Sequence, residues 1–453
     1  MPFVEGNSEA AASDSAIATD EDRRALVRFV EFLVIASACA IWLAAILNVR
    51  PLLSANDRSR WCTVWSLVER GTYQIDEISR KRGWDTIDKV YHEEHFYSSK
   101  PALYPTLVAG VYWVVKQITG WDLAEQTVAT VRLILCLINL LPMVAALLVL
   151  SRLLNRYAQT DATRVFVLVV AAFGTMLTPF IVTLNNHTPA AVGVLLALYP
   201  AMRIVADGVE GPSYFALSGF LAAFACTNEL PAALFGLALF GLLLLKSPTR
   251  TLTWFVPAAL IPLCGFFITT YLCTGGWKPF YMYFGTEKYL YVVDGVRSYW
   301  LDPQGIDKGG DSALVYLLHC TLGHHGIFSL SPVFLLTLAA WLQPRTWRDR
   351  PLGLFVWMGA LLSAAILVFY LTRTANYNYG GNTSGLRWMF WLIPFWLVAI
   401  IPIFDSLGRR RWFRLLAALL LFVSAFSAFR PINNPWRPPW LFELMDVWGW
   451  ISY

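Results

Sequence analysis

The chain has 453 residues, of which 57% are hydrophobic and only 14% are Asp, Glu, Lys or Arg, against roughly 25% charged residues in ordinary soluble domains. Mean hydropathy is +0.53, and a soluble domain has no place to bury so much apolar surface. The composition therefore excludes a cytosolic enzyme, a disordered chain and a fibrous repeat. The net charge of +5 does not indicate a nucleic-acid partner, because the basic residues recur in short clusters between apolar runs, as in cytoplasmic loops. We predict an all-α polytopic membrane protein.

The N-terminal segment divides into a polar tail and a first span. Residues 1–22 are rich in Ser, Ala and acidic residues and are predicted to form a disordered cytoplasmic tail. The apolar run Phe29–Leu47 follows three arginines. It is too long and too far from the start for a cleaved signal peptide, so we expect a retained signal anchor with its N-terminus inside. The transmembrane domain is predicted to cover residues 23–430.

Further apolar runs predict ten more crossings, for about eleven helices (10–13) in all. They lie at 128–150, 164–184, 188–206, 214–229, 231–246, 252–274, 326–343, 352–372, 387–404 and 412–429. The status of one more run, 102–118, decides the topology. The basic linkers are Arg152/Arg156/Arg164, Lys246/Arg250, Arg345/Arg348/Arg350 and Arg409/Arg410/Arg411/Arg414.

The positive-inside rule favours a re-entrant or interfacial segment at 102–118. All four basic linkers fall on one side of the membrane only if this run does not cross. The N-terminus is then cytoplasmic and the C-terminus extracytoplasmic, and the loops 48–101 and 275–325 and an aromatic tail at 431–453 lie outside. Together with the turn at 184–187, these outer segments hold all six His, so we expect function at the outer face. The alternative is that longer loops simply collect polar residues.

The first outer loop carries the most informative residues. Asn56, Asp57 and Arg58 begin a predicted amphipathic helix with Trp61 and Trp65 on one face. Such a helix lies in the membrane interface and would hold Asp57 near its surface. The loop then becomes polar and re-enters an apolar run at Lys100, where an ammonium could meet a lipid phosphate. The alternative for Lys100 is an interface lysine that snorkels to water.

Three other outer segments are candidates for binding. Residues 185–189 (Asn-Asn-His-Thr-Pro) place Asn186 and His187 between two spans, although the pattern also suits a turn capped by Thr188. Glu229 lies between two spans, where a carboxylate is costly, or is a surface turn residue. Residues 379–387 form a Gly-rich loop that ends in Arg387, whose amides and guanidinium suit a phosphate. The alternative there is a flexible hinge.

The sequence predicts no metal site and no cofactor. It has no Asp-x-Asp pattern, and His324 and His325 are adjacent rather than four positions apart. The acidic residues at 302–311 lack EF-hand spacing.

Two motifs resemble the GT-C superfamily of membrane glycosyltransferases, in particular bacterial relatives of protein O-mannosyltransferases and lipid A aminoarabinose transferases. Residues 97–104 read Tyr-Ser-Ser-Lys-Pro-Ala-Leu-Tyr, similar to the family's Tyr-x-x-Lys-Pro-Pro-Leu-Tyr with Ala102 in place of the second Pro. Residues 380–387 resemble a Gly-Gly-x-x-x-Gly-x-Arg element. Where the family usually has an acidic pair in the first loop, this chain has Asn56-Asp57. The resemblance is greatest over the first ~130 residues.

This resemblance implies a GT-C-like helical bundle and hexosyl or pentosyl transfer from a polyprenyl-phosphate sugar. The acceptor would be a lipid, glycan or protein hydroxyl at the outer face of a bacterial inner (plasma) membrane. Asp57 would be the general base and Glu229 would position the acceptor. The donor phosphate would be held by Lys100, Arg387, Arg58 and His95, and Asn56, Tyr97, Asn186 and His187 would contact substrate.

Other functions compete with transfer. A transporter or flippase of lipid-linked glycans would place polar residues near the midplane on broken helices, whereas here they gather at one face, with Glu31 in the first span as an exception. A glycan polymerase or ligase would be expected to have one very large outer loop. A structural or assembly role is the remaining alternative.

Overall fold

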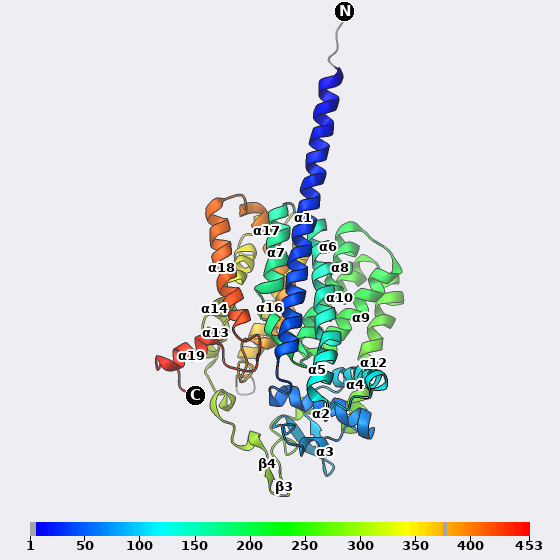
Figure 1. Cartoon of the computed structure of the whole chain (residues 1–453), viewed down its shortest axis with the longest axis vertical. Helices are drawn as coiled ribbons and strands as arrows, with labels where there is room; N and C mark the ends of the chain where they lie inside the picture. Colours follow the sequence, from blue (N-terminus) through cyan, green and yellow to red (C-terminus); the bar gives the residue numbers. More distant parts are fainter. Residues whose placement is uncertain (1–5, 375–377) are drawn as a thin grey trace, which may run out of the picture.

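The computed structural model describes residues 6–374 and 378–453, and most of the chain is a bundle of long helices (Figure 1). Within these residues, seven helical segments are long and apolar enough to cross a membrane, and two shorter apolar helices accompany them. The η segments are short 3-10 or π stretches. The bundle comprises α1 (Gly6–Asn48), α5 (Thr127–Leu135), η1 (Cys136–Leu140), α6 (Leu141–Tyr157), α7 (Asp161–Phe173), α8 (His187–Asp207), α9 (Pro212–Asn228), α10 (Ala233–Lys246), α11 (Pro248–Arg250), η4 (Thr251–Phe255), α12 (Val256–Thr274), α14 (Ile327–Leu330), η8 (Pro332–Phe334), α15 (Leu335–Trp341), α16 (Gly353–Leu371), η10 (Arg387–Leu392), α17 (Ile393–Leu407) and α18 (Arg411–Phe429).

Two of the expected spans are interrupted. The run 164–184 is helical only as far as Phe173, and the chain beyond it forms the short segment η2 (Thr178–Val182). The run 326–343 breaks after Leu330, because Pro332 has no backbone N–H to continue the helix. The N-terminal part of α1 is more regular than the sequence predicts. Residues 6–22 continue the helix instead of forming an irregular tail, and their alanines favour that conformation.

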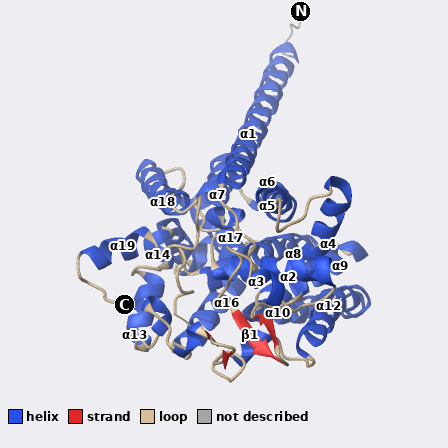
Figure 2. Cartoon of the chain, turned by 60° about the horizontal axis from the view of Figure 1, so that its bottom comes forward, coloured by secondary structure: helices blue, strands red, loops and turns tan. Residues whose placement is uncertain are grey.

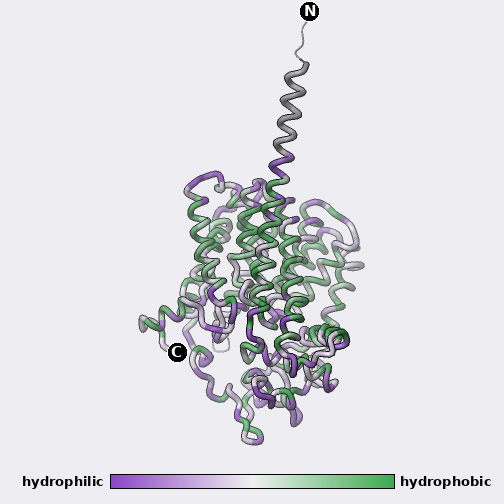
Figure 3. Tube along the Cα trace, viewed as in Figure 1, coloured by the Kyte–Doolittle hydropathy of each residue, from purple (hydrophilic) through white to green (hydrophobic). Residues whose placement is uncertain are grey.

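The core of the bundle lies between α8 and α17. Every residue from Ile393 to Asp405 in α17 is buried, and α8 is buried over most of its length. A helix that is apolar all round belongs inside a bundle. The outer helices instead keep large exposed apolar side chains, such as Ile261, Leu361 and Phe422, which suits contact with lipid. Figure 3 shows this apolar band, with polar segments toward both ends of the bundle.

One end of the bundle, the linker end, collects the basic linkers. Arg350 donates to the carbonyl of Tyr157 at 2.9 Å and to Asp405 Oδ2 at 2.7 Å, and Asp405 also accepts from the backbone of Gln159. The linkers after α6 and before α16 therefore meet the end of α17 there. Nearby, Glu31 is buried in α1 and accepts from Ser151 Oγ of α6 at 2.8 Å. This hydrogen bond joins two helices, so Glu31 has a packing partner in the first span.

The opposite end, the loop end, is built from the first loop and from residues 275–325. Figure 2 brings it forward and shows the strands and short helices that cover it. Its elements are α2 (Ala55–Arg70), α3 (Asp76–Ser79), β1 (Lys89–His92), β2 (His95–Ser98), α4 (Leu103–Thr119), η3 (Leu230–Ala232), η5 (Phe280–Tyr283), β3 (Val292–Val293), β4 (Val296–Arg297), η6 (Tyr299–Leu301), η7 (Gly305–Lys308), α13 (Ala313–Thr321) and α19 (Trp440–Val447); η9 (Pro344–Thr346) lies in the basic linker before α16.

Strands β1 and β2 form an antiparallel hairpin in which Val90 pairs with Tyr97 and His92 with His95. The two turn residues between them have positive φ, as a tight two-residue hairpin requires. The predicted polar stretch before Lys100 therefore contains a hairpin. Strands β3 and β4 form a second short antiparallel pair.

The run 102–118 is helix α4, and it packs against α2 at the loop end (Figure 1). Glu69 of α2 accepts from Tyr112 Oη at 2.5 Å and pairs with Lys116. Two contacts to one half-buried carboxylate hold α4 beside α2. That packing supports our proposal that this segment is re-entrant or interfacial.

Candidate functional site

Helix α2 carries three polar side chains of the site, those of Asn56, Asp57 and Arg60. Ser54 caps it, and its hydroxyl accepts from the backbone N–H of Asp57 at 3.1 Å. The apolar face carries Trp61, Val64 and Trp65 and is buried, as the periodicity predicts.

Asp57 is buried among hydrogen-bond donors. Its Oδ1 accepts from the indole of Trp61 at 3.0 Å and from the backbone N–H of Leu184 at 2.9 Å, and its Oδ2 accepts from Leu53 N–H at 3.2 Å. Burial raises the pKa of Asp57 to about 6, although these backbone hydrogen bonds and Arg60 act in the opposite direction. The carboxylate is thus ionised at neutral pH and still basic enough to take a proton.

Arg60 links α2 to the start of α8. Its guanidinium donates to the carbonyl of Asn56 at 3.0 Å, to the side-chain oxygen of the same residue, and to the side-chain oxygen of Asn186. Burial and the nearby Arg387 lower its pKa to about 10, so the group stays charged at neutral pH. An arginine in this position is anchored by neutral oxygens and keeps its charge available.

A continuous hydrogen-bonded chain runs from Asn186 to Arg387. The amide of Asn186 donates to Glu229 Oε1 at 2.6 Å, and His187 Nδ1 contacts the same oxygen. Arg387 Nη1 lies 2.9 Å from His187 Nε2. A guanidinium can only donate, so Nε2 accepts and Nδ1 carries the proton that it donates to Glu229. The geometry therefore assigns one tautomer to a neutral His187.

The cap of α8 differs from the expected one. Asn186 is the residue before the helix, and the side chain of Asn185 accepts from the backbone N–H of Thr188 at 2.8 Å. Thr188 is inside the helix, because the helix begins at His187. Asn186 and His187 are consequently free to face Glu229.

Arg387 is fixed by the Gly-rich loop. Its Nε and Nη2 donate to the carbonyl of Gly380 at 3.1 and 2.9 Å, and its guanidinium lies 5.1 Å from the ring centre of Trp436. Gly380 has φ +99°, and a Cβ there would lie 3.1 Å from Arg387 Nε. Glycine is therefore required both for the turn and for the close approach.

Lys100 completes a group of three cations. Its Nζ lies 2.9 Å from Asp88 Oδ2. Burial lowers the pKa of Lys100 to about 8; Asp88 acts against this effect, whereas Arg60 and Arg387 add to it. The charges of Arg60 and Arg387 both act on Lys100, so the site gathers Arg60, Lys100 and Arg387 around a small region at the loop end. The carboxyl groups of Asp88 and Glu229 lie beside these cations.

Three predicted residues do not join the hydrogen-bonded chain. Arg58 turns back to the carbonyl of Ser54 at 3.3 Å. His95 pairs with Asp76 at 3.3 Å, because it begins β2 next to the start of α3. Tyr97 is buried in an aromatic cluster and lies 5.4 Å, ring centre to ring centre, from Phe280. Within the part of the chain that the structure describes, none of the three forms a hydrogen bond or ion pair with Lys100 or Arg387.

The chain also contains residues that we did not single out as site residues. Arg60 follows Asn56 by four positions on α2, and this helical spacing was a usable signal. Asp88 and Trp436 carried no such signal, since they reach the site only through the hairpin and the C-terminal segment.

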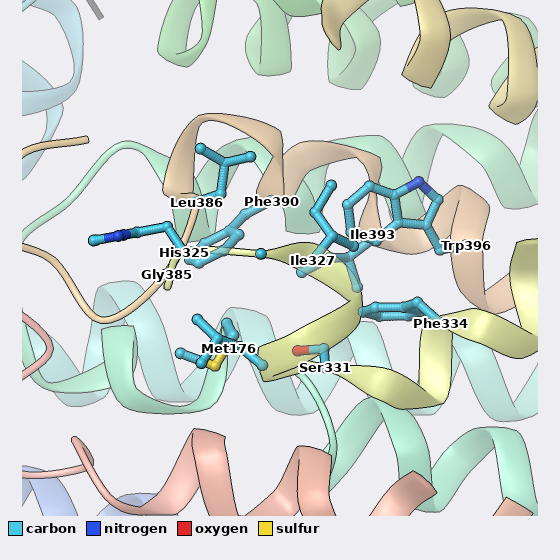
Figure 4. A pocket seen from close by; sticks show the side chains of 12 residues that line it. Met176, His325, Ile327, Ser331, Phe334, Gly385, Leu386, Phe390, Ile393 and Trp396 are labelled. Carbon is cyan, nitrogen blue, oxygen red and sulfur yellow. The ribbon is translucent and has the colours of Figure 1, made fainter. Parts of the chain in front are cut away.

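An apolar pocket lies beside the Gly-rich loop. Figure 4 shows Leu386, Phe390 and Trp396 on one wall and Phe334 and Met176 on the other, with His325 at one end. His325 Nε2 contacts the carbonyl of Thr383 at 3.0 Å. The pocket is thus adjacent in sequence to Arg387 but carries little charge. Within the described ranges, no three His, Cys, Asp or Glu side chains are placed to hold a metal ion.

No family model matches the chain, and no curated protein matches it. Its structure is similar to ArnT from Cupriavidus metallidurans in the apo state, with a TM-score of 0.50 and 14% identity over 86% of this chain and 62% of that one. It is also similar to the Archaeoglobus fulgidus oligosaccharyltransferase in the apo form, with a TM-score of 0.49 and 14% identity over 93% and 57% of the two chains. The chain thus spans less than two thirds of the length of either protein.

The match to ArnT extends over most of this chain and therefore beyond the first loop, where the sequence resemblance is greatest. The protein is an integral, multi-pass membrane protein that shares the fold of ArnT.

Proposed function

We propose that the protein is a membrane glycosyltransferase that moves a hexosyl or pentosyl group from a polyprenyl-phosphate donor to an acceptor hydroxyl at the outer face of the membrane. The observation that carries the proposal is the meeting of Arg60, Lys100 and Arg387 at the loop end of the bundle. A lipid phosphate presents its charge at that depth while its tail stays in the membrane.

The three cations suit a leaving phosphate. Negative charge grows on the phosphate oxygen as its bond to the sugar breaks, and fixed cations at that position lower the barrier. Arg60 and Arg387 are anchored by neutral oxygens of Asn56, Asn186 and Gly380, so their charges are not cancelled by direct pairing there. Lys100 would exchange its contact with Asp88 for the phosphate.

Asp57 is the proposed general base. It would take the proton of the acceptor hydroxyl as that oxygen attacks the anomeric carbon, and the polyprenyl phosphate would leave with the electron pair of the broken bond. Oδ1 accepts from Trp61 and Leu184 and Oδ2 from Leu53, and a hydrogen bond from Thr183 also favours the ionised carboxylate. With a pKa of about 6, the carboxylate is matched to catalysis near neutral pH.

Glu229, Asn186 and His187 would hold the site in shape and position the acceptor. Their hydrogen bonds connect the turn after α9 to Arg387. Because the carboxylate receives two donors, it fixes both the Asn186 amide and the His187 tautomer.

The location at the outer face of a bacterial inner membrane rests on charge. The basic linkers meet at the linker end, opposite the three cations, and the positive-inside rule puts that end in the cytoplasm. No nucleotide-sugar donor is needed if the activated sugar reaches the outer face on a lipid.

The test is sugar transfer by an Asp57→Asn variant in membrane vesicles supplied with a polyprenyl-phosphate sugar. We expect normal insertion and a loss of transfer of at least about 10²-fold, as for removal of a general base. Asp85→Asn is the matched control, because Asp85 is an exposed carboxylate of the same loop whose side chain pairs only with Lys89 among the contacts of the described chain. Transfer by Asp57→Asn at the wild-type rate would refute Asp57 as the base.

A further inference from the structure

A second and more polar cleft lies behind the Gly-rich loop. It is lined by Ser384 of that loop, by Ser427 and Arg430 at the end of α18, and by Arg437 and Trp440 at the start of α19. None of these residues belongs to the hydrogen-bonded chain that contains Glu229 and Arg387.

Two arginines in the cleft share one carboxylate. Arg430 pairs with Glu443 Oε2, and Arg437 lies 2.8 Å from Glu443 Oε1. This trio carries a net charge of +1. Each guanidinium has five N–H donors, which is more than a single carboxylate can accept, so the pair retains donors for a second anion.

Hydroxyl groups complete the lining. Ser384 is buried, and its Oγ has no hydrogen-bond partner within the part of the chain that the structure describes. The backbone N–H of the same residue is held by the carbonyl of Pro435 at 2.8 Å. Ser427 Oγ accepts from the indole of Trp440 at 2.9 Å. A buried hydroxyl without a partner is costly, and an occupant with acceptor oxygens would satisfy it.

Because it is formed at the end of a predicted span, we expect the cleft to lie at the level where the membrane ends. It is formed at the last residues of α18, and α19 continues into Val447, Trp448 and Trp450, whose side chains are exposed. Tryptophan beside exposed apolar side chains is typical of the lipid headgroup region. An anion in that region is most often the phosphate of a lipid.

We propose that this cleft binds a phosphate group, presented by a lipid headgroup of the same leaflet as the catalytic site. Arg430 and Arg437 supply the charge and paired N–H donors that recognise phosphate oxygens, and Ser384 supplies a hydroxyl donor. The inference does not depend on the proposed transfer reaction, because it rests on a different set of residues.

The cleft is connected to the proposed catalytic site through Trp436. This residue lies between Arg430 and Arg437 in sequence, its ring stacks near Arg387, and its indole donates to Thr183 Oγ1 at 2.9 Å. A headgroup bound to Arg430 and Arg437 would therefore steady the segment that covers Arg387.

The test uses the full chain extracted from vesicles of phosphatidylcholine and phosphatidylglycerol, with retained lipids counted by native mass spectrometry. We expect the wild type to retain phosphatidylglycerol in preference to phosphatidylcholine, and Arg430→Gln/Arg437→Gln to weaken this retention by roughly 10-fold or more, the effect of losing charge-assisted hydrogen bonds. Arg411→Gln, at the opposite end of α18, is the control and should retain the lipid normally.

A Glu443→Gln variant separates binding from a merely structural role. Without the Glu443 carboxylate, no group competes with the phosphate for the two arginines, so lipid retention should rise. If the arginines have only a structural role, the variant should lose stability and leave lipid retention unchanged. Thermal-shift measurements with inorganic phosphate identify the source of the anion. Stabilisation by free phosphate that is lost in the double arginine variant shows that the phosphate group alone suffices. Stabilisation by phosphatidylglycerol but not by free phosphate shows that the lipid headgroup is required. Equal lipid retention by wild type, the double variant and Glu443→Gln would overturn the proposal.

Discussion

Arg387 donates a hydrogen bond of 2.9 Å to Nε2 of His187, a residue 200 positions earlier in the chain. The bond joins the Gly-rich loop to the start of α8 and makes the orientation of the guanidinium depend on the protonation of an imidazole. His187 in turn donates to Glu229. Arg387 is therefore a positioned cation, and its position depends on three separate parts of the fold.

Replacing Arg387 by Lys is expected to impair transfer although the charge is retained. A lysine ammonium is a point charge and cannot reproduce the planar fork that reaches Gly380 and His187 together. We expect kcat/KM for a polyprenyl-phosphate sugar to fall by at least about 10-fold, as for loss of a fixed donor to a developing charge. Arg297→Lys, at an exposed strand residue, is the control. Full activity of Arg387→Lys would mean that charge alone is needed.

A methyl group added at Gly380 is expected to displace the Arg387 side chain. The residue has φ +99°, and an added Cβ would lie 3.0 Å from Thr383 Cγ2 and 3.1 Å from Arg387 Nε. The strained backbone should cost about 1–3 kcal/mol, visible as a lower melting temperature together with reduced transfer. Gly241→Ala meets nothing within 4 Å and should change neither quantity. If Gly380→Ala lost stability but kept its kcat/KM, the loop would not set the position of Arg387.

The pH dependence of kcat/KM should be bell-shaped. Asp57 must be ionised to act as a base, and since its pKa is raised to about 6 the active fraction grows as pH rises through that value. Lys100 must be charged to bind phosphate, and since its pKa is lowered to about 8 the active fraction falls as pH rises through that value. The profile of kcat should lose part of its alkaline limb, because bound phosphate keeps Lys100 protonated.

The variant Lys100→Arg tests the alkaline limb directly. Arginine stays charged throughout this range, so the fall of kcat/KM near the Lys100 pKa should move to higher pH while the acidic limb is unchanged. An alkaline limb at the wild-type position in this variant would assign it to another group.

Reporter fusions test the sidedness of the two ends. A reporter after Gly120, which ends α4, should lie outside the cell, and one after Asn155, near the end of α6, should lie inside. A reporter at 155 found outside would put the three cations on the cytoplasmic face and contradict transfer from an extracytoplasmic donor.

The sequence predicts those elements of the fold that depend on local periodicity. The amphipathic pattern around Trp61 and Trp65 predicts α2 and its buried face. Apolar runs predict the spans, and they fail where the backbone is interrupted locally, as at Pro332. Arg60 was within reach of the same argument, because its spacing from Asn56 is one helical turn.

The sequence by itself determined the membrane class of this protein, the order of its spans and the candidate residues Asp57, Lys100, Glu229 and Arg387, since hydropathy and residue type are local properties. Only the tertiary structure decided which of them act together. The pairing of Lys100 with Asp88, the exclusion of His95 and Tyr97 from the hydrogen-bonded chain, and the stacking of Trp436 on Arg387 are all set by how distant segments pack. Such contacts produce no periodic pattern in the sequence, because they form between side chains of the helices, the hairpin and the C-terminal segment, which are distant along the chain.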